Sequence, residues 1–214
     1  CPLPKARFTL AGDIRLSRSD EVVTYVARHL DPYRGVHVFM RALPALLQRR
    51  PHARIVIVGG DGKGYGAAAP AGKSWRQVFV NEVKDAIPAE DWARVHFVGS
   101  LGRQEFTSLL QVSRVHVYLS YPFVLSWSLL EAMSVGCSIV ASNTAPVREA
   151  ITHGEHGELV DFFDGPSLVN RISCLLDDTK QRERLGSLAR QRAVERYDLK
   201  RVCLPQQLTW INSL

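Results

Sequence analysis

The sequence of 214 residues lacks the marks of several protein classes. No apolar run approaches the roughly 20 residues that a membrane-spanning helix needs, and the start has no basic-then-apolar signal pattern. The four cysteines, Cys1, Cys137, Cys174 and Cys203, are scattered without the short paired spacings of a zinc site or a redox motif. We therefore expect a cytoplasmic protein with reduced thiols and no metal site.

A catalytic constellation is missing as well. No Ser-His-Asp or Cys-His arrangement can be identified, and no two carboxylates are placed for acid and base chemistry. His116 lies inside an apolar strand pattern, where a packed histidine is more common than a base. We expect that this chain does not contain the catalytic chemistry by itself.

Basic residues, in contrast, are plentiful and unevenly placed. The formal net charge is +6, and the window from Lys180 to Arg201 holds eight Lys or Arg against three Asp or Glu. A solvated helix face explains this window, and a contact with anionic lipid, nucleic acid or a partner domain is the alternative. Aromatic residues do not interleave with the basic ones, so we do not expect nucleic acid binding. A peripheral contact with the membrane surface stays open.

Short apolar strands alternate with helical patterns from residue 21 onward. This alternation predicts an α/β fold, a Rossmann-like parallel sheet of about six strands with helices on both faces. Residues 1–20 lack a stable period and are expected to be a lead-in or linker, 21–197 form the domain, and 198–214 form a helical tail. The strands are predicted at 22–27, 53–58, 95–98, 115–119, 138–141 and 158–160.

Ligands of such sheets bind beyond the carboxyl ends of the strands, and two kinds of phosphate-binding group fall there. Arg28 ends the first strand, and Arg34 lies in the loop beyond it, so the two guanidinium groups are candidates for clamping a diphosphate. Ser126, Trp127 and Ser128 stand where a helix begins, and free backbone amides gather at such a point. The alternative for both arginines is an ordinary surface position.

Two further features have more than one interpretation. The glycine-rich stretch after the second strand resembles a phosphate loop at Gly72-Lys73-Ser74, but Ala67 stands where that motif needs a glycine, so we expect a flexible or lid-like loop.

Glu131 is the best-placed carboxylate. It either accepts hydrogen bonds from vicinal hydroxyls such as those of a ribose, or caps its own helix in a box with Ser128.

Together these motifs resemble one family. They are Tyr25-Val26-Ala27-Arg28 with Arg34-Gly35, the run Ile55 to Gly62, Val95 to Gly99, and above all Ser128-Leu-Leu-Glu-Ala-Met-Ser-Val-Gly-Cys-Ser-Ile-Val-Ala141. The chain is similar, over about residues 22–197, to the C-terminal, donor-binding domain of retaining glycosyltransferases of family 4 (glycosyl transferases group 1), which pair two Rossmann-like domains in the GT-B arrangement.

The resemblance implies a role for each matching residue. Arg28 and Arg34 would hold the donor diphosphate with the amides near Ser126, Trp127 and Ser128, and Glu131 would bind the ribose. The residues implied for the base are Phe97, Val98, Gly99 and Leu101, and those on the sugar side are Phe123, Val124 and Leu125. The substrate would be a UDP- or GDP-linked sugar, with no cofactor and no metal.

The sequence departs from the family at two points. Phe123 stands where the first glutamate of the family's Glu-seven residues-Glu motif touches the transferred sugar, which puts sugar recognition in doubt. Nothing in these residues supplies the N-terminal acceptor domain of the two-domain enzyme, and the catalytic residues are expected in that domain. We therefore expect the donor half of an enzyme, inactive alone, that partners its own N-terminal domain. A nucleotide-sugar 2-epimerase of GT-B-like fold and a non-catalytic nucleotide-binding module are the alternatives.

Overall fold

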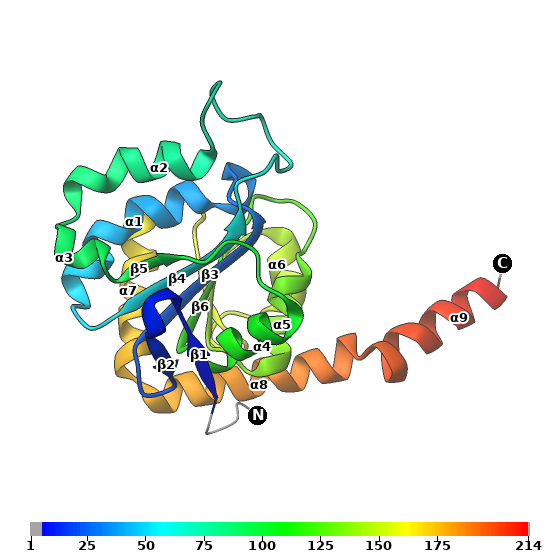
Figure 1. Cartoon of the computed structure of the whole chain (residues 1–214). Coiled ribbons are helices and arrows are strands. Elements are labelled where there is room, and N and C mark those ends of the chain that lie inside the picture. The colour runs from blue at the N-terminus through cyan, green and yellow to red at the C-terminus, as the bar shows by residue number, and fades with distance from the viewer. Residues whose placement is uncertain (1–5, 214) are drawn as a thin grey trace.

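A computed structural model of the chain describes residues 6–213. Its centre is a parallel sheet of six strands in the order β5-β4-β3-β6-β7-β8 (Figure 1). All six predicted strands are present, and the central strands β3, β4, β6 and β7 are short apolar runs that the helices bury from both sides. The strands are β3 (Val22–His29), β4 (Arg54–Gly60), β5 (Val95–Phe97), β6 (Val115–Tyr118), β7 (Ile139–Ser142) and β8 (Glu158–Val160).

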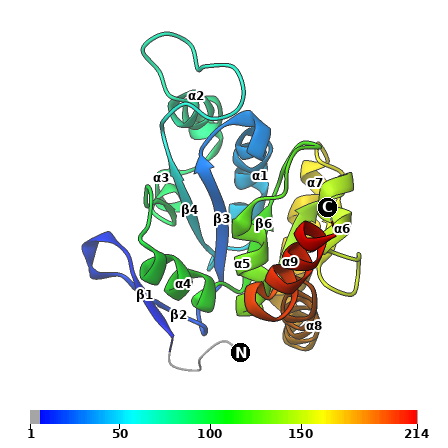
Figure 2. The same cartoon turned by 90° about the vertical axis from the view of Figure 1, so that its right-hand side faces the viewer.

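Helices cover both faces of this sheet, as predicted (Figures 1 and 2). One face packs on α1, α2 and α7, and the other on α4, α5 and α6. The helices are α1 (Val36–Arg49), α2 (Trp75–Val83), α3 (Ala89–Trp92), α4 (Arg103–Val112), α5 (Trp127–Val135), α6 (Ala145–Ala150), α7 (Gly165–Asp177), α8 (Thr179–Tyr197) and α9 (Leu204–Asn212). α5 begins where the sequence predicts a helix start, and Gly136 ends it in the left-handed conformation at φ 82°.

The strand order contains one reversal. From β3 the chain moves outward to β4 and β5, and it then returns to the centre and continues through β6, β7 and β8 on the other side. The connections that leave β3 and β6 therefore diverge beyond their carboxyl ends, which is the place where ligands of open α/β sheets bind. The short helix η2 (Pro32–Arg34) follows β3 at this edge, and the segment 119–126 follows β6.

The chain before β3 differs from the expected linker. Residues 7–17 form an antiparallel hairpin of β1 (Arg7–Thr9) and β2 (Arg15–Ser17), which lies beside α4 (Figure 2). Phe8 and Leu16 are buried in a third apolar cluster that they share with Val56 of β4 and Leu109 of α4. The hairpin is thus part of the folded body, and the sequence did not predict it because each strand buries one side chain.

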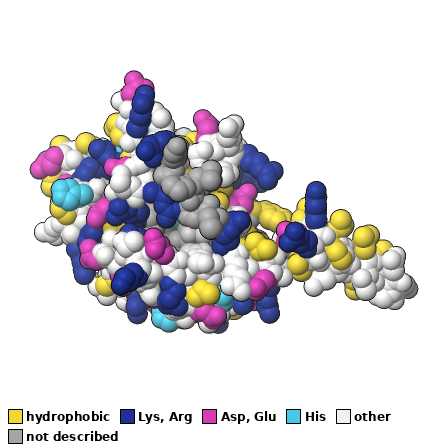
Figure 3. Space-filling model, turned by 90° about the horizontal axis from the view of Figure 1, so that it is seen from below, with side chains coloured by type: hydrophobic (Ala, Val, Ile, Leu, Met, Phe, Trp, Pro, Cys, Tyr) yellow, Lys and Arg dark blue, Asp and Glu magenta, His cyan; other side chains and the backbone are white. Residues whose placement is uncertain are grey.

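The C-terminal segment leaves the body of the protein. α8 passes below the sheet, and a π-helical turn (Leu199–Cys203) joins it to α9, which projects away from the domain (Figure 1). α9 has no buried residue, and Leu204, Leu208, Trp210 and Ile211 are exposed. Apolar side chains, drawn in yellow, accordingly lie on the surface of the projecting segment (Figure 3). In residues 6–213 no helix is long and apolar enough to span a membrane, and no cluster of three or more His, Cys, Asp or Glu side chains forms a metal-binding group.

Candidate donor site

Arg34 is the buried cation at the carboxyl edge of the sheet. The residue is 7% exposed, and its guanidinium Nη1 donates hydrogen bonds to the Tyr118 hydroxyl at 3.3 Å, to Ser120 Oγ at 3.1 Å and to the Val124 carbonyl at 3.1 Å. These acceptors are neutral, and no ion pair of Arg34 occurs in the part of the chain that the structure describes. A buried guanidinium without a carboxylate favours an anionic ligand.

Two aromatic rings cover this guanidinium. Its carbon lies 5.4 Å from the ring centroid of Tyr65 and 5.3 Å from that of Phe123, and the two centroids are 5.0 Å apart. Tyr33 meets Phe123 edge to face at 5.8 Å. Aromatic faces attract a cation without neutralising it. The rings therefore hold Arg34 in place and leave its charge available to a ligand, while they form an apolar wall at the position implied for the sugar.

The backbone around Arg34 is fixed by two buried polar groups. Asp31 is 2% exposed and caps η2 by accepting a hydrogen bond from the Arg34 amide at 3.2 Å. The hydroxyl of Tyr25 donates to the Arg34 carbonyl at 2.5 Å. Burial raises the pKa of Tyr25 well above its ordinary value, so the phenol remains a donor. This anchoring sets the direction of the Arg34 side chain before any ligand arrives.

The first half of the glycine-rich loop lies against the same residues. Asp31 also accepts a hydrogen bond from the Tyr65 amide at 3.3 Å, which brings the Tyr65 ring over the site. A Cβ atom at Gly64 would overlap the Asp31 carboxylate, and one at Gly66 would stand 2.7 Å from the Tyr33 ring. Glycine is thus required where the loop approaches η2. The loop forms a cover over Arg34, in line with the lid-like loop expected from the sequence.

The start of α5 uses some of its own amides. Ser126 is the N-cap, and its Oγ accepts from the Ser128 amide at 3.3 Å. The Ser126 amide donates to the hydroxyl of Tyr118 at 2.9 Å, so it contacts the same phenol as Arg34. Trp127 is 81% exposed, and its amide has no partner among the described residues. Of the three amides predicted to face a phosphate, the Trp127 amide is therefore the free one.

Glu131 does not cap α5. The helix cap is Ser126, and no hydrogen bond joins Glu131 to Ser128 in the described residues, so the capping-box alternative is wrong. Glu131 is exposed, yet neighbouring atoms desolvate its carboxyl group enough to raise the pKa, with Arg103 acting in the opposite direction. Its carboxylate therefore remains open to a ligand.

The other predicted residues take varied positions. Arg28 stands exposed near the end of β3, at the edge where Arg34 is buried. The side chain of Val124 is 62% exposed although its carbonyl binds Arg34. Leu125 is half-buried against the apolar cluster around α5, so it supports the helix start and does not line the open edge.

The residues predicted for the base lie at the other end of the edge, after β5. The Val98 amide donates to the Ile57 carbonyl at 3.0 Å, and the Gly99 carbonyl accepts from the Gly59 amide at 2.9 Å, so this segment continues the sheet pairing. Phe97, Val98 and Leu101 line a cavity of about 590 Å³ between β5, α4 and the hairpin. The predicted residues thus lie along one edge, with the base group on the outer strand and the diphosphate group at its centre.

Sequence reasoning missed the residues that hold Arg34. Tyr118 lies inside the predicted strand 115–119 and Ser120 follows it, whereas Asp31 and Tyr65 lie in loops for which the motifs imply no contact. Tyr118 and Ser120 alternate along β6 and its extension, so a search for polar side chains at strand ends would have found them. The role of Tyr65 follows from the path of the loop, for which the sequence carries no local signal.

Curated proteins share sequence similarity with most of this chain. Spore coat protein SA of Bacillus subtilis is 27% identical over 202 residues, which are 92% of this chain and 50% of that protein. Phosphatidyl-myo-inositol mannosyltransferase of Mycolicibacterium smegmatis is 27% identical over 183 residues, 85% of this chain and 42% of that protein. The chain therefore spans about half the length of the curated relatives it matches.

Solved structures share the fold. Sucrose-phosphate synthase from Thermosynechococcus elongatus superposes with a TM-score of 0.75 at 22% identity, over 92% of this chain and 46% of that one. Anabaena HepE, solved in complex with UDP and glucose, superposes with a TM-score of 0.73 at 25% identity, over 92% of this chain and 50% of that one. The family model for glycosyl transferases group 1 matches residues 10–192. The chain thus belongs to the glycosyl transferases group 1 family, as the resemblance of its motifs predicted.

Proposed function

We propose that this chain binds the donor for a glycosyltransferase that moves a sugar from a nucleotide diphosphate sugar to an acceptor, with retention and without a metal ion. The observation that carries the proposal is the buried guanidinium of Arg34, which lies where the strand order reverses. This guanidinium pairs with no carboxylate among the described residues, and it shares the Tyr118 hydroxyl with the start of α5. Family membership and the UDP-bound relative HepE support the same donor class.

The chemistry assigned to these residues is electrostatic. Cleavage of the bond between the sugar and the diphosphate leaves negative charge on the departing phosphate oxygen. Arg34, Arg28 and the free Trp127 amide would stabilise this charge where it develops. Because the tyrosine and serine oxygens hold Arg34 in place beforehand, little reorganisation is needed during the reaction. Glu131 would accept hydrogen bonds from the ribose hydroxyls.

Phe123 gives the sugar side an apolar character. Its ring packs against Tyr33 and Tyr65, so a carboxylate contact with the sugar is replaced by a face suited to the C–H groups of a pyranose. We propose that this aromatic wall selects a sugar with few polar contacts at that position. A second domain of the whole protein would supply the acceptor site, and the exposed apolar side chains of α9 suit a contact with it.

Calorimetry of the chain with UDP, GDP and ADP tests donor binding. We expect one of the uracil or guanine nucleotides to bind, Arg28→Ala to weaken it about tenfold, and Glu131→Ala to weaken it less. Arg196→Ala, on the exposed side of α8, is the matched control for loss of a positive charge. An absence of binding by all three nucleotides to the wild type refutes the donor site.

Activity of the whole protein separates the reaction classes. We expect transfer to an acceptor with the anomeric configuration of the donor retained, as read by NMR, and unchanged rates in the presence of EDTA. Conversion of a nucleotide sugar without an acceptor would indicate an epimerase, and nucleotide affinity without any turnover would indicate a binding module. We further propose a cytoplasmic location with at most a peripheral contact with the membrane surface, which cell fractionation tests.

A further inference from the structure

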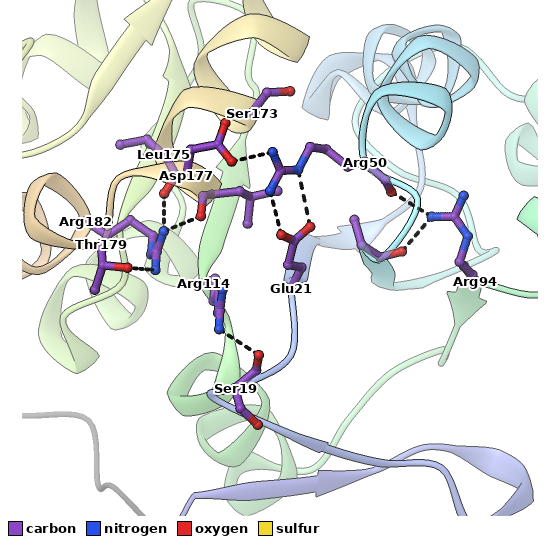
Figure 4. Close-up of polar contacts among 12 residues, drawn as sticks. Ser19, Glu21, Arg50, Arg94, Arg114, Ser173, Leu175, Asp177, Thr179 and Arg182 are labelled. Atoms are coloured by element: carbon purple, nitrogen blue, oxygen red, sulfur yellow. Dashed lines mark hydrogen bonds and ion pairs between the residues drawn. The ribbon is translucent and has the colours of Figure 1, made fainter.

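A second group of arginines lies at the opposite, amino-terminal edge of the sheet (Figure 4). Part of this group is neutralised. Arg50 forms ion pairs with Glu21 at 2.5 Å and with Asp177 at 2.6 Å, and Arg94 pairs with Asp91 at 2.6 Å. These pairs tie α1 to β3 and α7, so their charges are compensated within the protein. The arginines near β4 therefore have a structural role.

The neighbouring arginines have no such compensation. Arg114 donates to the carbonyls of Arg18 at 3.0 Å and Ser19 at 2.6 Å, and Arg182 donates to the carbonyl of Leu175 at 2.5 Å. Arg190 donates to a backbone carbonyl of α5. Among the described residues none of Arg18, Arg114, Arg182 and Arg190 forms an ion pair. Four positive charges therefore gather without a carboxylate in contact.

These charges act on one another. Burial lowers the pKa of Arg182 first, and the positive charges of Arg114 and Arg18 lower it further, while the carboxylates of Glu183 and Asp178 act in the opposite direction. All four arginines are partly withdrawn from solvent. Bringing like charges together in a half-buried place costs free energy in the unliganded protein. An anion at this place would relieve that cost.

The four arginines line one cavity. It has a volume of about 510 Å³, and it is bounded by the ends of α4 and α5 and by one side of α8. Its lining holds one carboxylate, Glu183, and the hydroxyl groups of Ser113, Ser138, Thr179 and Ser187. Ser138 is 3% exposed, and its Oγ has no hydrogen-bond partner in the described residues. An unsatisfied buried hydroxyl beside uncompensated guanidinium groups is a pattern that a bound oxyanion would complete.

We propose that this cavity binds the phosphate group of a phosphorylated ligand, with Arg18, Arg114 and Arg182 as charge partners and the Ser138 hydroxyl as a donor. Phosphate fits because guanidinium groups pair with its oxygens in a fork, and several can share one tetrahedral anion. The volume exceeds that of a phosphate ion and suits a small organic phosphate or a lipid headgroup. The site lies at the opposite edge of the sheet from Arg34 and is independent of the proposed donor site.

Inorganic phosphate is the first probe, and its binding is measured by calorimetry and by thermal unfolding. Arg18 is the residue to change, because its guanidinium makes no hydrogen bond in the described residues and its loss spares the fold. We expect Arg18→Gln to weaken phosphate binding about tenfold. Arg15→Gln, on the same hairpin with an exposed side chain, is the matched control and should leave the affinity unchanged. Equal affinities of the two variants would overturn the proposal.

A second variant distinguishes binding from a structural role. Ser138→Ala removes a hydroxyl that has no partner, so we expect unchanged thermal stability without phosphate and a few-fold loss of affinity with it. Arg18→Gln should unfold at the same or a higher temperature than the wild type without phosphate, since it removes repulsion. A lower unfolding temperature, together with unchanged phosphate affinity, would show that Arg18 is structural and would contradict the proposal.

Vesicles identify the source of the phosphate. Phosphatidylcholine vesicles with a minor share of phosphatidic acid test a lipid headgroup, and pure phosphatidylcholine vesicles are the control. If the protein binds only the vesicles that contain phosphatidic acid, and this binding depends on Arg18, the ligand is a lipid headgroup. Arg18-dependent binding of free phosphate supports a soluble ligand. If neither probe binds the wild type, the proposal fails. Saturating UDP should leave either result unchanged, so this outcome does not depend on the donor site.

Discussion

Replacing Gly64 by alanine tests whether the glycine-rich loop covers Arg34. The added Cβ would overlap the Asp31 carboxylate and would lie 2.9 Å from the Asp31 Cβ, so rotation of the carboxylate alone does not relieve the overlap. Asp31 is itself held by the amides of Arg34 and Tyr65. The loop must therefore lift away from η2.

The cost of lifting the loop sets the size of the effect. Lifting breaks the hydrogen bond between Tyr65 and Asp31, which contributes about 1 kcal/mol, and separates the Tyr65 and Phe123 rings, which contributes about another 1 kcal/mol. Overpacking strain beyond this sum is relieved by the movement itself. We expect the free energy of unfolding to fall by about 2 kcal/mol, and the unfolding temperature by roughly 4–8 °C for a domain of this size.

Thermal unfolding and limited trypsin digestion measure the two effects. Lys63 lies exposed in the loop, next to Gly64, and we expect faster cleavage there once the loop is lifted. Gly165→Ala is the control, because a Cβ at that position of α7 meets no atom within 4 Å. If Gly64→Ala and Gly165→Ala unfold at the same temperature and resist trypsin equally, the loop does not pack on Asp31 and the reasoning is refuted.

Three further outcomes are expected. Arg34→Met should abolish calorimetrically detectable nucleotide diphosphate binding, because it removes the buried cation, whereas Arg34→Lys should retain part of it; equal binding by wild type and Arg34→Met would contradict the site. Phe123→Ala should remove one of the two rings that hold Arg34 and weaken diphosphate binding a few-fold in the same assay, with Val124→Ala on the exposed side as control. Burial lowers the pKa of His116 to about 4, so between pH 6.5 and 4 this histidine is protonated in the unfolded chain and neutral in the native protein. Stability present at neutral pH should therefore fall by up to about 3 kcal/mol as pH drops from 6.5 toward 4, and His116→Asn should flatten this slope in urea unfolding curves.

The sheet could be predicted because its strands carry their own signal. Val22 to Ala27 and Ile55 to Val58 are runs of β-branched residues between turn residues, and a strand buried on both faces requires such a run. The hairpin of residues 7–17 could not be predicted in the same way. Its strands have three residues each, and a period of two cannot be read from a segment that buries one side chain.

The site was predictable at the level of charge and not at the level of contacts. Arg34 follows a strand, and a helix start follows another, so their meeting at one edge is a consequence of parallel strands. The partners of Arg34 come instead from loops whose paths depend on distant contacts, as Tyr65 and Asp31 show. The choice of Ser126 over Ser128 as the cap of α5 also rests on a distant group, since the Tyr118 hydroxyl holds the Ser126 amide.

The projecting helix α9 has a consequence for the cooperativity of unfolding. A helix of nine residues is shorter than the roughly 12–15 residues at which an isolated helix becomes stable in water, and α9 buries no side chain against the body. Its helical state is therefore maintained through its continuity with α8 and is a local equilibrium separate from the global one. We expect its amides to exchange with deuterium within the earliest time points, while those of β3 and β6 exchange only through global unfolding. Docking of α9 onto a partner would convert that local equilibrium into a protected one, so hydrogen exchange at residues 204–212 reports directly on assembly.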